Sequence, residues 1–370
     1  MTFPGGIQEE FQRFESLIAD AMLRVGRSGR LILSSEVESF QLEFAAWLGV
    51  SGVVGVASGT DALTLILKAL DIGAGDEVVI PATATPTLFG VARTGATVRF
   101  ADIDPLSLSV TPTTVSRVLS KRTRAVVIVH LYGQPIDVRP FEDLLRGRGI
   151  EIIEDCAQAH GARLGKDSVG IHSHASAWSF YPTKNLGAMG DAGAVASNDE
   201  DLLARISRLR QYGETERYSA AEFGFNSRLD ELQAAILRIK LHHLHDMIAA
   251  RRTAAQLYCD GLRESLFVLD EQPGTVNSRH LFPIRVENRD RVLARLKARG
   301  IPAGCHYPLP ANLQPCVTGR GASDHCRNAE DLSKNVLTLP MHPYLSEDHV
   351  REVIGCVLDE HASRDGERSA

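Results

Sequence analysis

The sequence has no apolar run long enough to span a membrane, and its first residues lack the basic and apolar regions of a signal peptide. Positive charge is not in excess either. The 40 basic residues face 46 acidic ones, and the net charge of −6 gives no reason to expect a nucleic acid or an anionic membrane as a partner. The six cysteines are scattered without a CxxC pair, as is typical of reduced thiols. We therefore expect a cytoplasmic globular protein.

Two motifs that define large enzyme classes are missing. The chain has neither the GxSxG of many hydrolases nor the GxGxxG of dinucleotide-binding proteins. Histidines gather in "HSH" (172–174) and "HHLH" (242–245), but neither group has a third carboxylate or thiolate at the spacing of a metal site. We therefore predict solvated histidines there and no metal ion.

Lysine is scarce, with seven lysines against thirty-three arginines, so the position of each lysine is informative. Lys184 stands in "SFYPTKNLGAMGDAGAVAS" (179–197), between two apolar runs that predict strands. Burial between strands disfavours the ammonium form and lowers the lysine pKa, which frees an amine to attack a carbonyl carbon. Arginine stays protonated and cannot do this. The alternative is an ordinary solvated loop lysine.

The pattern of apolar runs predicts an α/β fold. At 370 residues the chain is long enough for two domains. Seven β-rich runs are found at 53–58, 77–82, 97–103, 124–132, 150–155, 176–181 and 193–197. Helical patterns separate the first five runs, which predicts a mostly parallel seven-stranded sheet with flanking helices on both faces. A short glycine-rich loop joins the last two, so one of them is expected to run antiparallel.

After residue 198 the pattern turns helical, and after 265 it becomes a shorter α+β pattern. A strand is expected at 280–286, a helix at 289–300 and a last helix at 346–361. We therefore expect a large domain over 1–240 and a smaller C-terminal α+β domain over 241–370. The segment 1–30 is a candidate to pack on the small domain.

Two strand ends carry groups that could bind a ligand, because ligands of an open α/β sheet collect beyond the carboxyl ends of its strands. Ser58-Gly59-Thr60 leads from a strand into a helix, and its free N–H groups and small side chains make an anion cradle. In "EDCAQAHGA" (154–162) an apolar strand delivers Asp155, with Gln158 and His160 just beyond. The alternatives are a tight turn, a turn-capping aspartate and a packing histidine.

Pyridoxal phosphate is the one ligand that needs all of these groups together. Its phosphate needs the cradle at the start of a helix, its aldehyde needs a lysine, and its ring nitrogen needs a carboxylate that keeps it protonated. Lys184, Asp155 and Ser58-Gly59-Thr60 supply these groups from one sheet, and Ser179 lies close enough to Lys184 to share its pocket. The sequence therefore predicts pyridoxal phosphate as the cofactor.

The longer motifs around these residues resemble the DegT/DnrJ/EryC1/StrS family of sugar aminotransferases, which have the type I fold of pyridoxal-phosphate enzymes. The resemblance spans roughly residues 30–345. It rests on "SGTDAL", "DIDP", "HLYGQPID", "EDCAQAHGA", "SFYPTKNLGAMGDAGAV", "YGETERY", "GFNSRLDELQAAIL", "HLFPIRVENRD", "HYPLPANLQP" and "LTLPMHP". The stretches around Lys184 and around 226–230 are distinctive of the family.

The resemblance implies a role for each matching residue of the cofactor site. Lys184 forms the Schiff base with the cofactor and later moves the proton, and Asp155 pairs with the pyridinium nitrogen. The residues implied in cofactor binding are Gly59, Thr60, Asp155, Gln158, Ser179, Lys184 and Asn226, with Asn226 coming from a partner subunit. A site shared in this way implies a homodimer.

The resemblance also implies substrate-binding residues. Arg228 is a candidate for binding the donor carboxylate or the sugar nucleotide, because a fixed guanidinium fork suits both. His306 and Tyr307 match the stretch that returns from the small domain to the substrate site. Relatives that act as dehydratases carry a histidine in place of the lysine, so Lys184 favours transamination.

Three departures from the family pattern concern the acceptor side. The family supplies an aromatic residue over the cofactor ring where this chain has Ala84 or Thr85, in a loop that is one residue shorter. Either something smaller covers the ring or Phe89 is placed differently. Members that aminate the sugar 3-position often show a histidine that is absent from "RYSAAEFG" (217–224), and "HLQP" reads "NLQP" with Asn312. We therefore expect an unusual acceptor.

The function predicted from these residues is that of a pyridoxal-phosphate-dependent aminotransferase. The amino group passes from an amino acid, by resemblance L-glutamate, through pyridoxamine phosphate to a keto group of a nucleotide-activated deoxysugar, with ping-pong kinetics. Two alternatives remain open. One is a keto-cyclitol aminotransferase of antibiotic biosynthesis, and the other is a non-catalytic, pyridoxal-phosphate-binding regulatory protein.

Overall fold

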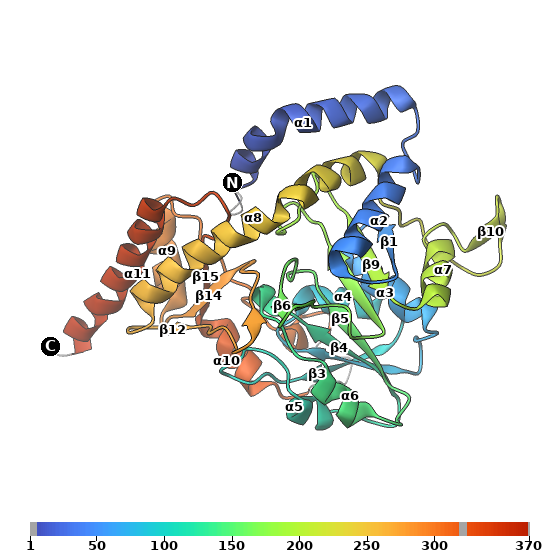
Figure 1. The fold of residues 1–370 in the computed structure, drawn as a ribbon. Coiled ribbons are helices and arrows are strands. Elements are labelled where there is room, and N and C mark those ends of the chain that lie inside the picture. The colour runs from blue at the N-terminus through green and yellow to red at the C-terminus, as the bar shows by residue number, and fades with distance from the viewer. Residues whose placement is uncertain (1–5, 318–323, 369–370) are drawn as a thin grey trace.

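The computed structural model describes residues 6–317 and 324–368, and its centre is a seven-stranded sheet (Figure 1). The strand order is β1-β9-β8-β5-β4-β2-β3. The pairs β5–β8, β4–β5, β2–β4 and β2–β3 are parallel, and β9 runs antiparallel to both β8 and β1. The strands are β1 (Gly52–Val56), β2 (Glu77–Pro81), β3 (Thr97–Ala101), β4 (Thr123–Val129), β5 (Glu151–Asp155), β8 (Ala175–Ser179) and β9 (Gly193–Ser197).

All seven predicted strands are therefore confirmed, including the antiparallel arrangement of the last two. The reason is visible in β4, where Val127 faces one buried core and Val126 and Ile128 face another. A strand that is covered on both faces must be apolar at every position, and this produces the continuous apolar runs of the sequence. The α/β fold class is also confirmed.

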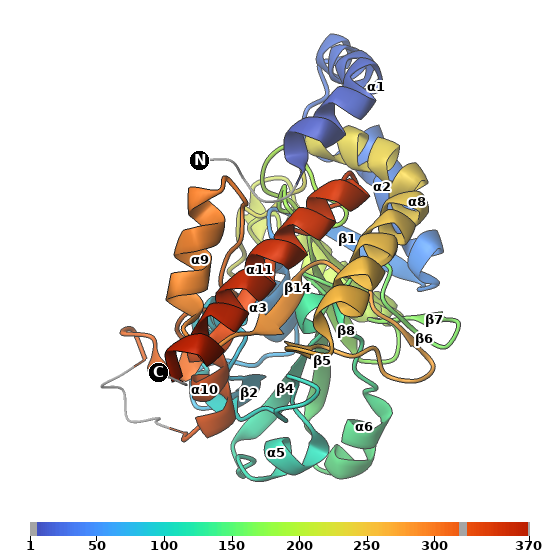
Figure 2. The same ribbon diagram turned by 90° about the vertical axis from the view of Figure 1, so that its left-hand side faces the viewer.

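Helices cover both faces of this sheet (Figures 1 and 2). On one face α3 and α7 contribute to the core that contains Val127, and on the other face α5 and α6 contribute to the core that contains Val126. The helices of this part are α2 (Ser35–Leu48), α3 (Gly59–Ala69), α4 (Thr85–Ala92), α5 (Pro112–Ser116), α6 (Arg139–Leu145) and α7 (Glu200–Leu209), with a 3₁₀ turn η1 (Leu131–Gly133). None of the helices in the described residues combines the length and the apolar composition of a membrane span.

A second body forms around a small antiparallel sheet, β12-β14-β15, with its own buried core. Its elements are β12 (Phe267–Val268), β14 (Phe282–Arg285), α9 (Arg289–Ala298), β15 (Val336–Leu339) and α11 (Glu347–Arg368), and η2 (Ala311–Leu313) and α10 (Arg327–Asn335) pack back against the large sheet. The strand expected at 280–286 and the helices expected at 289–300 and 346–361 are confirmed within a few residues, except that α11 continues to Arg368.

The 32-residue helix α8 (Glu231–Leu262) connects the two bodies. Leu237 and Leu244 in its first half belong to the core beside the large sheet, whereas Tyr258 and Leu262 in its last turns belong to the small core. We propose that the boundary between a large and a small domain lies within this helix. Helix α1 (Ile7–Ser28) runs along α8 (Figure 1).

Short hairpins complete the fold. One small sheet has the order β13-β6-β7, formed by β6 (Arg163–Leu164), β7 (Asp167–Ser168) and β13 (Thr275–Val276). The other is the hairpin of β10 (Glu214–Glu216) and β11 (Ser219–Ala220), which projects away from the body beside α7 (Figure 1).

Candidate active site

Asp155 is held at the carboxyl end of β5 by two hydrogen bonds. Thr87, a buried residue of α4, donates its hydroxyl to Oδ2 at 2.7 Å, and the Ala157 N–H donates to Oδ1 at 3.0 Å. Both carboxylate oxygens are therefore oriented, and the carboxylate is buried beside the middle of the sheet. The sequence predicted Asp155 but not Thr87, because a threonine two residues into a helix has no local pattern that indicates a contact with this carboxylate.

Lys184 lies in the loop between β8 and β9 and is partly buried. Its backbone N–H donates to the Tyr181 carbonyl at 2.8 Å, which closes a tight turn. Burial lowers the pKa of Lys184 to about 8, and the nearby Asp155 carboxylate opposes this shift. The lysine and the aspartate thus face the same space, and the structure does not support the alternative of an ordinary solvated lysine.

Because a neutral amine is needed to attack an aldehyde, capture of pyridoxal phosphate by the apoenzyme should depend on pH. The neutral form of Lys184 increases as pH rises through its pKa, so the rate of capture should rise with a midpoint at about 8. Stopped-flow absorbance between pH 7 and 11 measures this rate, with Lys184→Ala apoenzyme as the control for capture elsewhere. A midpoint close to the ordinary lysine value of 10.5 would contradict the buried environment.

Three histidines surround the lysine from different elements. Burial lowers the pKa of His160 to about 3 and that of His306 to about 4, and it places the pKa of His280 well below the usual value, with the charge of Lys184 acting in the same direction. His160 packs against the rings of Trp178 and Phe180, with centroids 5.1 and 5.5 Å away. These imidazoles are neutral, so they add no charge that would compete with a bound anion or carboxylate.

The cradle at the start of α3 lies directly against the end of β8. A Cβ placed on Gly59 would lie 2.7 Å from the Ser179 Cβ, so only glycine allows this approach. Ser58 caps the helix by accepting a hydrogen bond from the Asp61 N–H at 3.1 Å. The N-terminal N–H groups of an 11-residue helix, which begins with Gly59 and Thr60, thus lie beside Ser179 and form a position suited to an anion. This cradle, together with Lys184 and Asp155, fits pyridoxal phosphate.

Gln158 connects this region to the segment that contains His306 and Tyr307. Its Oε1 accepts a hydrogen bond from the Tyr132 N–H at 2.6 Å, and its Nε2 donates to the Tyr307 hydroxyl at 3.4 Å. The Tyr132 hydroxyl in turn donates to the His306 carbonyl at 2.5 Å. His306 and Tyr307 are therefore brought to the site as the sequence suggested, and Tyr132 is a contact that sequence reasoning missed.

Asn226 and Arg228 are not brought into this group of residues. Asn226 is exposed, and Arg228 is half-buried with no hydrogen bond or ion pair to any residue that the structure describes. Ser227 between them is anchored, because it donates to Asp61 Oδ2 at 2.6 Å and accepts from the Ala57 N–H at 3.1 Å. The segment is thus fixed beside α3 while its two neighbouring side chains stay available for other contacts.

The residues that depart from the family pattern lie in different parts of the structure. Ala84 is buried at the start of α4, and Phe89 is 46% exposed and lines a groove with Val98 and Val317. Phe89 and Thr87 project about 200° apart on the helix, so Phe89 points away from Asp155 and does not replace the aromatic residue. Asn312 donates to the Glu330 carboxylate at 3.1 Å and to a backbone carbonyl, and therefore faces α10.

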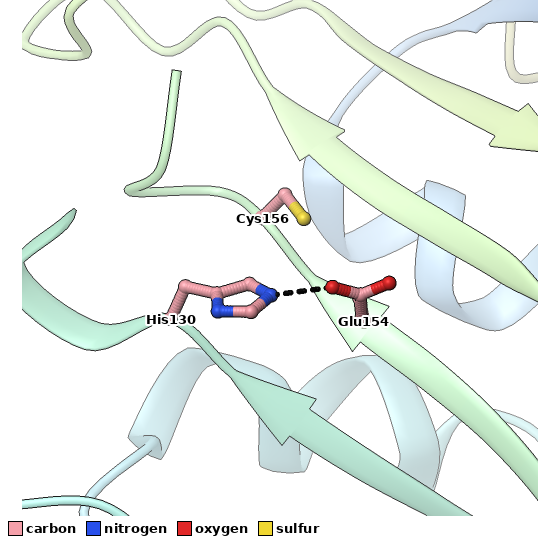
Figure 3. A group of neighbouring side chains, drawn as sticks. All are labelled: His130, Glu154 and Cys156. Atoms are coloured by element: carbon pink, nitrogen blue, oxygen red, sulfur yellow. Dashed lines mark hydrogen bonds and ion pairs between the residues drawn. The ribbon is translucent and has the colours of Figure 1, made fainter. Parts of the chain in front are cut away.

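His130, Glu154 and Cys156 form a compact buried group in which each residue offers one possible metal ligand, and all these atoms lie within 4.8 Å (Figure 3). His130 Nε2 is 2.8 Å from Glu154, and His130 Nδ1 accepts from the Ile136 N–H at 3.0 Å. Burial raises the pKa of the Cys156 thiol well above its usual value. Both imidazole nitrogens are thus occupied and the thiol stays protonated, so the group is a hydrogen-bonded support for the end of β5.

A cradle for phosphate, a lysine of lowered pKa and an oriented carboxylate at the carboxyl edge of this sheet define a pyridoxal-phosphate-dependent aminotransferase of fold type I. Comparison with known proteins agrees: residues 13–358 match the DegT/DnrJ/EryC1/StrS aminotransferase family. The chain belongs to this family.

Individual relatives are similar over nearly their whole length. A dTDP-3-amino-3,4,6-trideoxy-alpha-D-glucose transaminase of Streptomyces venezuelae is 41% identical, over 94% of this chain and 93% of that protein. A UDP-N-acetyl-3-dehydro-alpha-D-glucosamine 3-aminotransferase of Acidithiobacillus ferrooxidans is 40% identical, over 87% and 88%. The crystal structure of S. venezuelae DesV in complex with a ketimine intermediate superposes with a TM-score of 0.93 at 39% identity, over 96% and 97%.

Proposed function

We propose that this aminotransferase moves an amino group from an amino acid, L-glutamate, to a keto group of a nucleotide-activated deoxysugar. The observation that carries the chemistry is the facing pair of Lys184 and Asp155, one with a lowered pKa and the other oriented by two hydrogen bonds. The acceptor class is supported by the relatives, whose names specify dTDP- and UDP-linked amino sugars.

In this proposal Lys184 would hold the cofactor through Nζ and would take and return the proton at the reacting substrate carbon. When bound, pyridoxal phosphate supplies an aldehyde that joins amines and a ring that withdraws electrons from the carbon that loses its proton. A lysine pKa of about 8 suits a base that must accept and return a proton near neutral pH. Asp155 stabilises the protonated ring nitrogen, and Thr87 keeps the carboxylate in place.

The proposal assigns the remaining cofactor contacts to residues of the same site. Gly59, Thr60 and Ser179 would hold the phosphate, and Gln158 would lie near the ring hydroxyl. His306 and Tyr307, which are bonded to Tyr132 and Gln158, would contact the substrate. Arg228, which has no partner among the described residues, is the proposed anchor for a substrate carboxylate or diphosphate.

We further propose that two copies of the chain form a homodimer with shared sites. The β10–β11 region exposes large apolar side chains, with Tyr218 83% exposed and Phe223 fully exposed, and Asn226 near its base is exposed too. A soluble enzyme covers such a projecting aromatic arm with a partner. In a dimer the exposed Asn226 of each copy would reach the phosphate at the site of its partner.

Mixing two inactive variants tests the shared site. Lys184→Ala and Asn226→Ala proteins should each be inactive or nearly so, but a mixed dimer has one site in which both residues are intact. After subunit exchange at equal amounts, about a quarter of wild-type activity should return, because half of the dimers are mixed and each has one working site. Activity that does not rise above the sum of the two variants would mean that Asn226 acts within its own chain or not at all.

Nucleotide inhibition tests the acceptor class. If the acceptor is a sugar nucleotide, dTDP or UDP alone should compete with it and slow the transfer of the amino group to the acceptor. The first half-reaction, with L-glutamate, should stay unchanged or be inhibited only at higher nucleotide concentration. A keto-cyclitol aminotransferase, the second candidate, has no nucleotide to recognise, so no inhibition by either nucleotide at millimolar concentration would favour that candidate.

A further inference from the structure

A second buried lysine, Lys240 of α8, contacts the loop that carries Lys184. It is 4% exposed, and its Nζ donates to the Gly187 carbonyl at 2.7 Å. Gly187 follows Lys184 by three residues, just beyond the 181–184 turn that the Lys184 N–H closes. A Cβ at Gly187 would lie 2.4 Å from the Pro182 carbonyl oxygen, so the Gly187 backbone lies directly against that turn. The Lys240 side chain thus binds backbone that packs against the turn carrying Lys184.

Gln233 of α8 lies seven residues before Lys240 and therefore on the same face of the helix. Its side chain binds the next part of the loop. Its Oε1 accepts from the Met189 N–H at 2.8 Å, and its Nε2 donates to the Met189 carbonyl at 3.2 Å. Two side chains of one helix thus hold three peptide groups of the loop. The loop also faces a cavity of ≈ 840 Å³ lined by Pro182, Met189 and Lys240, while Leu186 and Ala188 of the same loop pack into the core beside α8.

The charge of Lys240 is balanced from α1. Glu10, which is 8% exposed, forms an ion pair with Nζ of Lys240. A buried ammonium needs such a partner, and Glu10 is the carboxylate that supplies it among the described residues. The ion pair therefore links the N-terminal helix to the catalytic loop through the buried side chain of Lys240.

We propose that Lys240 and Gln233 form a clamp that positions Lys184 for the reaction. Glu10 of α1 balances the charge of Lys240 within this clamp. Lys240 and Gln233 are positioning residues, because they touch the loop and leave the reacting atoms to Lys184. The proposal rests on the role of Lys184 in the proposed function, which makes the placement of this loop a determinant of rate. Small errors in the placement of a catalytic group have large effects on rate.

The test replaces the buried pair by apolar side chains of similar length in the double variant Glu10→Met/Lys240→Met. Exchanging a buried ion pair for well-packed apolar groups keeps the fold, which a single Lys240 variant with an unpaired Glu10 would put at risk. Gln233→Ala is a second, independent variant at a more exposed position. Lys68→Met is the matched control, since Lys68 also donates to a backbone carbonyl, that of Thr94 at 3.0 Å, but belongs to α3 and touches no part of the loop.

Hydrogen exchange of the apoenzyme, read by mass spectrometry on peptides that cover 182–190, is the first measurement. The double variant and Gln233→Ala should exchange at least about tenfold faster there, with unchanged exchange elsewhere in the sheet and with Lys68→Met like wild type. In the holoenzyme, the limiting rate constant of the reaction with L-glutamate should fall about tenfold, while the glutamate concentration at half-maximal rate stays the same.

Unchanged exchange at 182–190 in folded variants would overturn the clamp. Faster exchange with an unchanged limiting rate constant would overturn its positioning role, because the contacts would then be structural only. Both results can be told apart from a failure of the proposed function itself. In that case Lys184→Ala would still react with L-glutamate, whereas the clamp variants could still show faster hydrogen exchange at 182–190.

Discussion

Replacing Lys184 by alanine should abolish transamination, with a fall in rate of at least about 10⁴-fold, because the variant loses both the amine that holds the cofactor and the group that moves the proton. The absorbance of the lysine-bound cofactor should disappear, while pyridoxamine phosphate still binds, since Gly59, Ser179 and Asp155 remain in place. Absorbance spectra and a single-turnover assay with L-glutamate measure the two effects.

Lys184→Arg is the matched control for charge. It keeps a cation and a long side chain in the loop, but a guanidinium remains protonated and cannot join an aldehyde, so this variant should be as inactive as Lys184→Ala. If the absorbance of a lysine-bound cofactor persisted in both variants, the cofactor would be attached to another of the seven lysines, and the assignment of Lys184 would be wrong.

The change Asp155→Asn should lower the rate of the reaction with L-glutamate by about 10²-fold or more, because a neutral amide cannot stabilise the protonated ring nitrogen that draws electrons from the reacting carbon. The amide oxygen can still accept the hydrogen bonds from Thr87 or Ala157, so the free energy of unfolding should change by only about 1 kcal/mol. Single-turnover kinetics and urea unfolding of the apoenzyme measure the two quantities.

Asp102 provides the control for this variant, because it also follows a strand of the same sheet at its carboxyl end. Its carboxylate accepts hydrogen bonds from the N–H groups of Asn328 and Ala329 at the start of α10, and thus caps a helix. Asp102→Asn should change stability and leave the reaction with L-glutamate intact. Equal rates for Asp155→Asn and wild type would show that Asp155, too, is only a turn cap.

The large sheet could be predicted because its strands are buried on both faces, which leaves uninterrupted apolar runs such as 124–132 in the sequence. Asp155 could be predicted for a related reason. A charged residue at the carboxyl end of a buried strand must lie at the edge of the sheet, where ligands of this fold collect. Lys184 could be predicted because it stands in the loop between two apolar runs, 176–181 and 193–197.

Other parts of the site depend on contacts between distant segments. Thr87 bonds to Asp155 across 68 residues and Lys240 bonds to Gly187 across 53, and neither threonine nor lysine has a local pattern that signals such a partner. Asn312 illustrates the opposite error: it departs from the family pattern, but its side chain faces α10, so this departure is no argument for an unusual acceptor. In the proposed homodimer the exposed Asn226 serves the site of a second chain, and a contact between chains leaves no pattern within one chain.

The most direct test of the proposed transamination is a two-step single-turnover experiment on the holoenzyme. With L-glutamate alone, the absorbance of the lysine-bound cofactor should disappear and one equivalent of 2-oxoglutarate should form per site. Addition of a dTDP- or UDP-linked keto-deoxysugar should then restore the absorbance and yield one equivalent of the amino sugar. If no amino donor bleaches the absorbance, the chain does not transfer amino groups, and the roles proposed for Lys184 and Asp155 are contradicted.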